Sequence, residues 1–329
     1  MGRVHPLIAP LLFLVTPGCS GAQPVDANAP LILERSIELP GVKGRIDHMA
    51  VDLTNMRLFV AEVAQGSVDE VDLGAGKVVG RIAGLRGPQG VAWLPLRNEL
   101  VVASDDGTVR FYGANLEEKA RVGLGDDADN VRIDPRNSHV IVGYGKGGLA
   151  VIDPVGHTVL SRLSLPGHPE GFQLSGAHAY INVPDDGSII AADIDRQQVL
   201  ARWPTGLHRL NFPMALAPGG RSITIAYRFP AALASINTAT GGTTSIAAGC
   251  GDADDVFEVN GHVLMICGSG QVNVSMPNGK VAQMGTRKGA RTGLYVPELG
   301  RLLIAAPAGV TSAAVLILKP GIDLLPRNP

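Results

Sequence analysis

The chain has 329 residues, with 28 Lys and Arg against 30 Asp and Glu, and a formal net charge of −2. This balance excludes a broadly basic nucleic-acid-binding protein, and a charged fraction of 18% argues against a disordered chain. The 42 Gly and 23 Pro disfavour long helices and suit short strands joined by tight turns, whereas three Cys are too few for a fold built on disulfides.

The first 30 residues predict export. Residues 1–18 contain the apolar run Leu7–Val15, which is too short to span a bilayer and is typical of a signal peptide. The stretch Thr16-Pro17-Gly18-Cys19 resembles the lipobox of bacterial lipoproteins, which implies that Cys19 is acylated and becomes the mature N-terminus. The alternative is ordinary cleavage after Ala22. We expect an exported protein, periplasmic or at the cell surface, whose only membrane contact is a lipid anchor followed by a flexible tether at 19–30.

One unit recurs from residue 31 to residue 319. Each unit has a short first strand, a continuously apolar second strand, an alternating third strand and a fourth strand. The first strands end at Asp52, Leu94, Asp134, Ser175, Ala217, Val259 and Val296. The second strands follow in step at Leu58–Ala61, Leu100–Ala103, Val140–Gly143, Ala179–Asn182, Ile223–Ala226, Leu264–Cys267 and Leu302–Ala305.

Seven units of four strands, with a period of about 40 residues, predict an all-β fold, a seven-bladed β-propeller over 31–319 with a C-terminal tail at 320–329. The last unit has only two clear strands after its first one, Leu302–Ala306 and Ala314–Lys319. The segment Leu31–Leu39 precedes the first unit and has no partner there. We therefore expect it to complete the seventh blade and join the two ends of the ring.

The passages between third and fourth strands resemble a known repeat family. Val71–Val79 and Ile152–Val159 are similar to the YVTN-type β-propeller repeat, and Tyr180-Ile181-Asn182 resembles the tetrad that names it. The resemblance implies a seven-bladed, exported bacterial protein. It implies little about activity.

The loop before each first strand, here called the leading loop, is the place where we expect a site. In a propeller these loops meet at one mouth of the central tunnel, where polar groups converge on a concavity. Blades three and six carry similar phrases, Asp127–Val131 and Asp252–Val256, and should face each other across the tunnel. The predicted ligand-binding residues are Asp47, His48, Gln89, Asp129, Asn130, Glu170, Asn211, Asp254, Asp255 and Arg291.

Two interpretations of these residues stay open. Hard oxygen ligands suited to Ca²⁺ or Mg²⁺ are offered by Asp129, Asn130, Glu170, Asp254 and Asp255. Asp and Asn side chains in such loops also commonly accept backbone N–H bonds and have only a structural role.

A separate group of basic residues, here called the basic arc, could receive an anion or balance the acidic residues. It comprises Lys43, Arg45, Arg287, Lys288 and Arg291.

The function predicted from these features is a cell-envelope binding scaffold, monomeric, whose mouth receives an unknown small ligand or an envelope protein and no nucleic acid. The alternative is a metal-dependent hydrolase similar to lactonase-type propellers, although those have six blades. No catalytic residue can be named and no cofactor is certain, with Ca²⁺ or Mg²⁺ the candidates.

Cys250 and Cys267 both lie near the predicted mouth, Cys250 in the leading loop of blade six and Cys267 at the end of a second strand. Export would permit a disulfide. We expect two separate thiols, because the turn at 252–255 should hold Cys250 outward.

Overall fold

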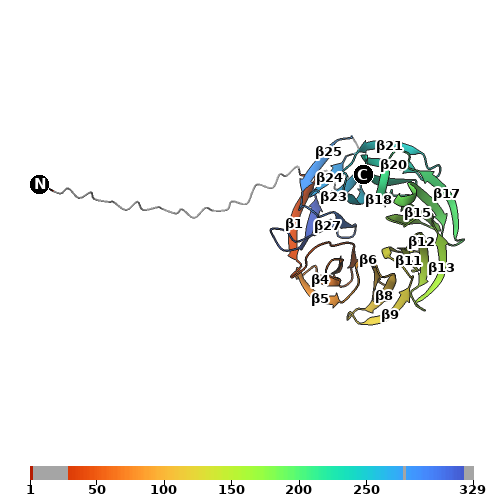
Figure 1. Ribbon diagram of the computed structural model, residues 1–329, viewed down its shortest axis with the longest axis horizontal. Coiled ribbons are helices and arrows are strands. Elements are labelled where there is room, and N and C mark those ends of the chain that lie inside the picture. The colour runs from red at the N-terminus through yellow and green to blue at the C-terminus, as the bar shows by residue number, and fades with distance from the viewer. Residues whose placement is uncertain (3–28, 277–278, 322–329) are drawn as a thin grey trace.

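The computed structural model describes residues 1–2, 29–276 and 279–321. Within these residues 28 strands form seven four-stranded antiparallel sheets, arranged as blades around a ring (Figure 1), which confirms the seven-bladed β-propeller. Most of the predicted signal peptide, tether and C-terminal tail, including Cys19, lies outside the described residues. None of the described segments forms a helix with the length and hydropathy needed to cross a bilayer.

Each of the first three blades is a meander of four consecutive strands, numbered outward from the tunnel. Blade one contains β2 (Met49–Asp52), β3 (Arg57–Glu62), β4 (Ser67–Asp72) and β5 (Lys77–Ala83). Blade two contains β6 (Pro88–Leu94), β7 (Glu99–Ser104), β8 (Thr108–Gly113) and β9 (Glu118–Gly123). Blade three contains β10 (Ala128–Ile133), β11 (Val140–Tyr144), β12 (Gly148–Asp153) and β13 (Thr158–Ser164).

The next three blades repeat this order, with one short 3₁₀ turn in blade four. Blade four contains β14 (Phe172–Ser175), β15 (His178–Val183), η1 (Pro184–Asp186), β16 (Ser188–Asp193) and β17 (Gln198–Pro204). Blade five contains β18 (Arg209–Leu216), β19 (Ser222–Phe229), β20 (Ala231–Asn237) and β21 (Thr243–Ala248). Blade six contains β22 (Ala253–Val259), β23 (His262–Cys267), β24 (Gln271–Ser275) and β25 (Val281–Gly285).

Blade seven joins the two ends of the propeller. Its strands are β26 (Thr292–Val296), β27 (Arg301–Ala306), β28 (Ala314–Pro320) and, outermost, β1 (Leu31–Glu38). β1 pairs antiparallel with β28 from Leu31 opposite Pro320 to Glu38 opposite Ala314, and Figure 1 shows β1 beside the last strands of the chain. The predicted closure by the N-terminal strand is therefore confirmed.

Burial explains the strand patterns. The second strand of a blade is covered on both faces by neighbouring blades, so Leu58, Phe59, Val60 and Ala61 in β3 are all buried. The fourth strand is outermost and alternates between partly buried and exposed residues, as β5 does. The core is consequently a ring of apolar layers between blades, and the first strands and their leading loops surround the tunnel.

Gly90 in β6 lies at a close approach between blades two and three. A Cβ at Gly90 would stand 1.8 Å from the backbone oxygen of Asp129, which leaves no room for a side chain. We expect Gly90→Ala to lower the free energy of unfolding by about 1–3 kcal/mol, the usual range for overpacking, measured by urea denaturation. Gly123→Ala is the matched control, because no atom lies within 4 Å of its Cβ position. Equal unfolding midpoints for the two variants would contradict this close approach.

Candidate functional site

The leading loops converge on a small polar cavity at one end of the tunnel, here called the mouth cavity. Its volume is about 40 Å³, enough for water or a small ion. Seven of the ten predicted site residues line it: Asp47, His48, Asp129, Asn130, Glu170, Asp254 and Asp255. The loops of blades three and six thus meet across the tunnel as predicted. Two arginines, Arg45 and Arg132, also line this cavity.

The other three predicted residues have different positions. Gln89 donates to the Asp127 carboxylate at 2.9 Å and does not line the mouth cavity. Asn211 is fully buried and donates to the side-chain oxygen of Asn182 and the backbone oxygen of Ser188, both at 2.9 Å. These two amides hold adjacent loops together. Arg291 binds Asp254 beside the cavity, with Nε 2.5 Å from Oδ2.

Three carboxyl groups of the mouth cavity are destabilised in their charged form. Burial, with a further contribution from the charge of Asp47, raises the pKa of Asp129 to about 7. Burial also raises the pKa of Glu170 to about 7, although Arg228 opposes this shift, and it raises the pKa of Asp255 to about 7. Among these three carboxyl groups, Asp129 has the fewest interactions to offset the loss of water, because its Oδ1 is buried without a hydrogen-bond partner. The nearest ring nitrogen, Nε2 of His48, is 3.9 Å from that oxygen.

Asp254 has two cationic partners. It forms ion pairs with Arg228 and Arg291, and Arg228 also donates to the backbone oxygen of Ala253 at 2.8 Å and stacks over the ring of Phe212. Burial lowers the pKa of Arg228 to about 10. Burial also lowers the pKa of Arg291 below its usual range. Asp254 therefore bridges blades five, six and seven, and its charge is already neutralised.

The predicted basic arc is only partly assembled. Arg45 pairs with Asp47 at 2.5 Å, so it belongs to the mouth. Arg287 instead donates to the backbone oxygen of Ser312, and Lys43 and Lys288 are exposed and do not line the cavity. Arg228, rather than these residues, supplies the additional positive charge at the mouth.

A larger cavity of about 400 Å³, here called the tunnel chamber, adjoins the mouth cavity. His48, Arg132 and Asp255 line both. The remaining walls are mostly apolar side chains of the first strands, such as Val131 and Phe257. A volume of this size, with apolar walls and a few polar groups at one end, is typical of a small-molecule site.

Arg132 and Gln173 are polar residues of the chamber that the sequence analysis missed. Arg132 lies over the ring of Phe172 at 5.5 Å and faces the charges of Asp255 and Asp129, while burial lowers its pKa. Gln173 donates to the backbone oxygen of Met214 at 2.8 Å. Their position in the sequence could have predicted this location, because both occupy the second position of the four-residue first strand. That position holds Ala50, Ala92, Arg132, Gln173, Ala215, Phe257 and Leu294, and all except Ala215 line the chamber.

The carboxylates of the mouth do not converge as metal ligands usually do. In the described part of the chain, one group of three His, Cys, Asp or Glu residues brings its ligand atoms within 4.8 Å of one another, and it is Cys250, Asp252 and Cys267. The predicted Ca²⁺ or Mg²⁺ set is therefore not assembled in this conformation. It stays a prediction.

A second large cavity, of about 410 Å³, lies between blades seven and one. Its charged residues already have partners: Arg301 pairs with Glu34 at 2.5 Å, and Arg35 donates to the backbone oxygens of Leu73 and Gly74. Because the charged residues that line this cavity are already paired, the tunnel is the better candidate for a ligand-binding site.

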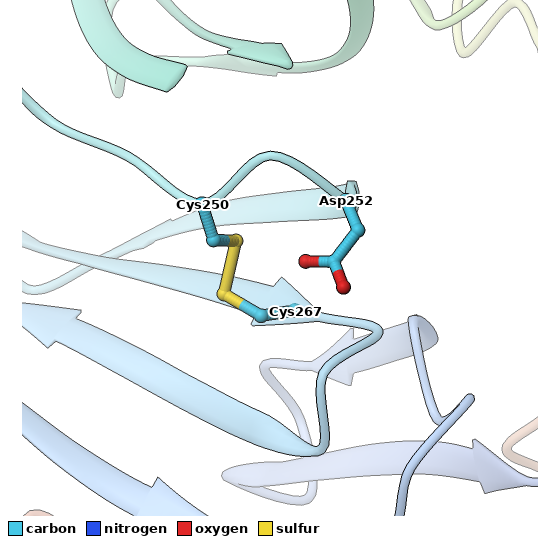
Figure 2. Close-up of side chains that lie close together, drawn as sticks. All are labelled: Cys250, Asp252 and Cys267. Carbon is cyan, nitrogen blue, oxygen red and sulfur yellow. A yellow bond between two sulfur atoms is a disulfide. The ribbon is translucent and has the colours of Figure 1, made fainter. Parts of the chain in front are cut away.

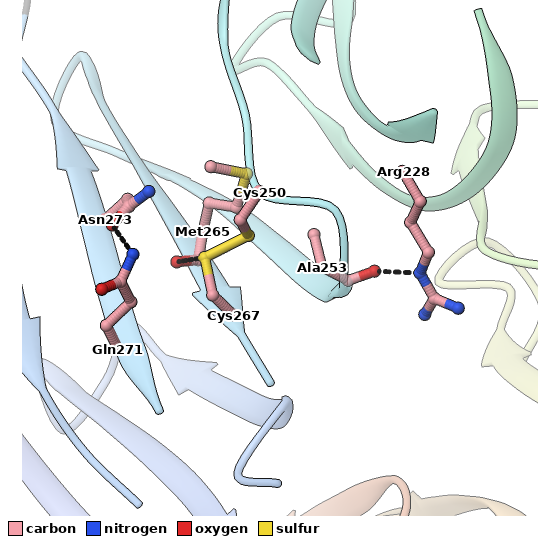
Figure 3. The surroundings of a disulfide bond; sticks show 7 residues. All are labelled: Arg228, Cys250, Ala253, Met265, Cys267, Gln271 and Asn273. Atoms are coloured by element: carbon pink, nitrogen blue, oxygen red, sulfur yellow. Dashed lines mark hydrogen bonds between the residues drawn. A yellow bond between two sulfur atoms is a disulfide. The ribbon is translucent and has the colours of Figure 1, made fainter. Parts of the chain in front are cut away.

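The expectation of two free thiols is wrong in this structure. Cys250 and Cys267 form a disulfide, with Cα atoms 6.1 Å apart (Figure 3). The turn at 252–255 does not hold Cys250 outward, because the ladder between β22 and β23 begins with Ala253 opposite Cys267 and brings the preceding loop back over the strand end.

Comparison with known proteins adds no family assignment: no family model matches the chain, and no curated protein matches its sequence.

Proposed function

We propose that this propeller is a binding protein of the cell envelope, whose tunnel receives a small ligand with an apolar body and a cationic, hydrogen-bond-donating end. The propeller fold is commonly a binding scaffold. The cell-envelope location rests on the export signal predicted for residues 1–18. The apolar body would occupy the tunnel chamber, and the cationic end would face the mouth cavity.

The buried, unpartnered Oδ1 of Asp129 carries the proposal. An unpaired buried carboxylate oxygen is unfavourable, so a ligand that donates to it gains the interaction that the protein lacks. The charge balance favours a cation, because five carboxyl groups and two arginines line the mouth cavity. The rim arginines Arg228 and Arg291 are already paired with Asp254.

The test uses 2-phenylethylamine and its uncharged counterpart 2-phenylethanol, with binding to the full chain measured by titration calorimetry. We expect the amine to bind at least about tenfold more tightly than the alcohol, a difference of about 1.4 kcal/mol. Asp129→Asn should remove this preference. Asp126→Asn, in the same leading loop but exposed and outside the cavity, should leave it unchanged.

The affinity for the amine should also rise with pH. Because the pKa values of Asp129 and Asp255 are raised to about 7, both groups gain charge as the pH increases through neutrality. Failure of the amine to bind, equal affinity for both compounds, or unchanged discrimination in folded Asp129→Asn would each overturn the proposal.

A further inference from the structure

A second site lies at the side of the mouth, where the disulfide links the leading loop of blade six to the end of β23. Figure 2 shows the carboxylate of Asp252 turned toward the two sulfur atoms of Cys250 and Cys267. The ligand atoms of these three residues all lie within 4.8 Å of one another. None of them lines the mouth cavity or the tunnel chamber, so this group is separate from the site described above.

Asp252 is available as a ligand. Among the described residues its side chain forms no hydrogen bond and no ion pair, and Arg228 and Arg291 act on it only through their charge. Its position is held through the backbone, since its carbonyl oxygen accepts from the N–H of Gly268 directly after Cys267. Two sulfurs and one carboxylate oxygen, delivered by one loop and one strand end, are three of the four ligands of a tetrahedral zinc site.

We propose that the reduced form of this protein binds Zn²⁺ through the thiolates of Cys250 and Cys267 and the carboxylate of Asp252, with water as the fourth ligand. A dithiol supplies the two electrons and two protons that convert the disulfide into two thiols and becomes a disulfide itself. Zn²⁺ binding then releases the two thiol protons to solvent. Thiolate sulfur favours Zn²⁺ over Ca²⁺ and Mg²⁺, which prefer oxygen ligands.

The burial of the three residues determines the side from which a reductant and Zn²⁺ can reach the site. Cys267 is fully buried, whereas Cys250 and Asp252 are partly exposed. A reductant and the metal ion therefore both approach from the leading loop. The bound ion would link the same two segments that the disulfide links, and it would keep Asp254 in place between its two arginines. The disulfide and the metal ion are alternative cross-links of the same loop. Each excludes the other, because both use the sulfur atoms of Cys250 and Cys267.

The experiment compares the full chain before and after reduction by dithiothreitol, with the reductant removed anaerobically before titration with ZnCl₂. We expect one Zn²⁺ per chain in the reduced protein and no binding at this site in the oxidised protein. Zn²⁺ should raise the Tm of the reduced protein only, because a ligand stabilises the state that binds it. Substitution of Co²⁺ should produce thiolate charge-transfer absorption.

Two variants assign the ligands, and both are made in a Cys19→Ser background, whose only cysteines are Cys250 and Cys267. Cys250→Ser should abolish the Co²⁺–thiolate absorption and the Zn²⁺-dependent rise in Tm. Asp252→Asn keeps both cysteines and the disulfide, and it should lower Zn²⁺ affinity by at least about tenfold, a loss typical even of residues that only orient a metal ligand. A reduced protein that takes up no Zn²⁺, or one whose affinity is unchanged in Asp252→Asn, would overturn the proposal without bearing on the tunnel.

Discussion

Deletion of residues 31–39 should leave a chain that does not form a stable ring. The deletion removes all of β1 and exposes the unpaired edge of β28 along the length from Ala314 to Pro320. It also removes Ile37 and Leu39, which are buried in the apolar layer between blades seven and one. We expect aggregation or loss of the cooperative thermal transition, measured by light scattering and circular dichroism.

Point variants in β1 separate this closure from a general effect of truncation. Ile37 is 1% exposed, and Ile37→Asp should lower the free energy of unfolding by about 4 kcal/mol or more, because it buries a charge without a partner. Leu33 lies on the same strand but is 50% exposed, so Leu33→Asp should change stability by less than about 0.5 kcal/mol. Folded, monomeric protein after the deletion, or equal stability of the two variants, would show that β1 does not close the ring.

The stability of the native protein should fall as the pH rises from about 5 to about 8, and Glu62 should be a main cause. Glu62 is fully buried in blade one beside Asp69, whose carboxylate already receives two hydrogen bonds from Arg81, at 2.5 and 2.7 Å. Burial, followed by a hydrogen bond shared with Asp69, raises the pKa of Glu62 to about 8.

The direction of the effect follows from proton linkage. A carboxyl group with a raised pKa holds its proton more tightly in the folded state than in the unfolded state. Its contribution to stability is therefore complete below the unfolded pKa and is lost as the pH rises through about 8. Asp129, Glu170 and Asp255 add to the same trend, since their pKa values are raised to about 7.

Glu62→Gln isolates the contribution of this group, because the amide keeps the shape of the protonated acid and cannot ionise. We expect the variant to match the native Tm at about pH 5 and to exceed it by several degrees at about pH 9, measured by scanning calorimetry, where 1 kcal/mol corresponds to about 2 °C in a domain of this size. Glu298→Gln, in the exposed turn before β27, changes the net charge equally and should follow the native curve. A Glu62→Gln variant with the native pH dependence would contradict the assigned pKa.

The predictable parts of the site are those that depend on chain position alone. The leading loops lie at the mouth because each precedes a first strand, so the sequence alone predicts that Asp129 and Asp255 lie on opposite sides of the tunnel. The pairing of Asp254 with Arg228 and Arg291 could not be placed in this way, because these residues come from three different blades. The sequence predicts a ligand-binding role for Gln89 and Asn211, whereas the structure shows that they join adjacent loops. An amide that binds a ligand and one that joins two loops have the same sequence signature.

The sequence by itself determined the number of blades, the order of their strands and the closure by β1. These features follow from the period of the apolar segments, because the apolar residues are the ones that become buried on folding. Only the tertiary structure decided which polar groups are paired, that Cys250 reaches Cys267, and that Arg132 projects into a chamber of about 400 Å³. Such contacts depend on the distance and tilt between neighbouring blades and on side-chain rotamers. The periodicity of a sequence contains no information on these three quantities.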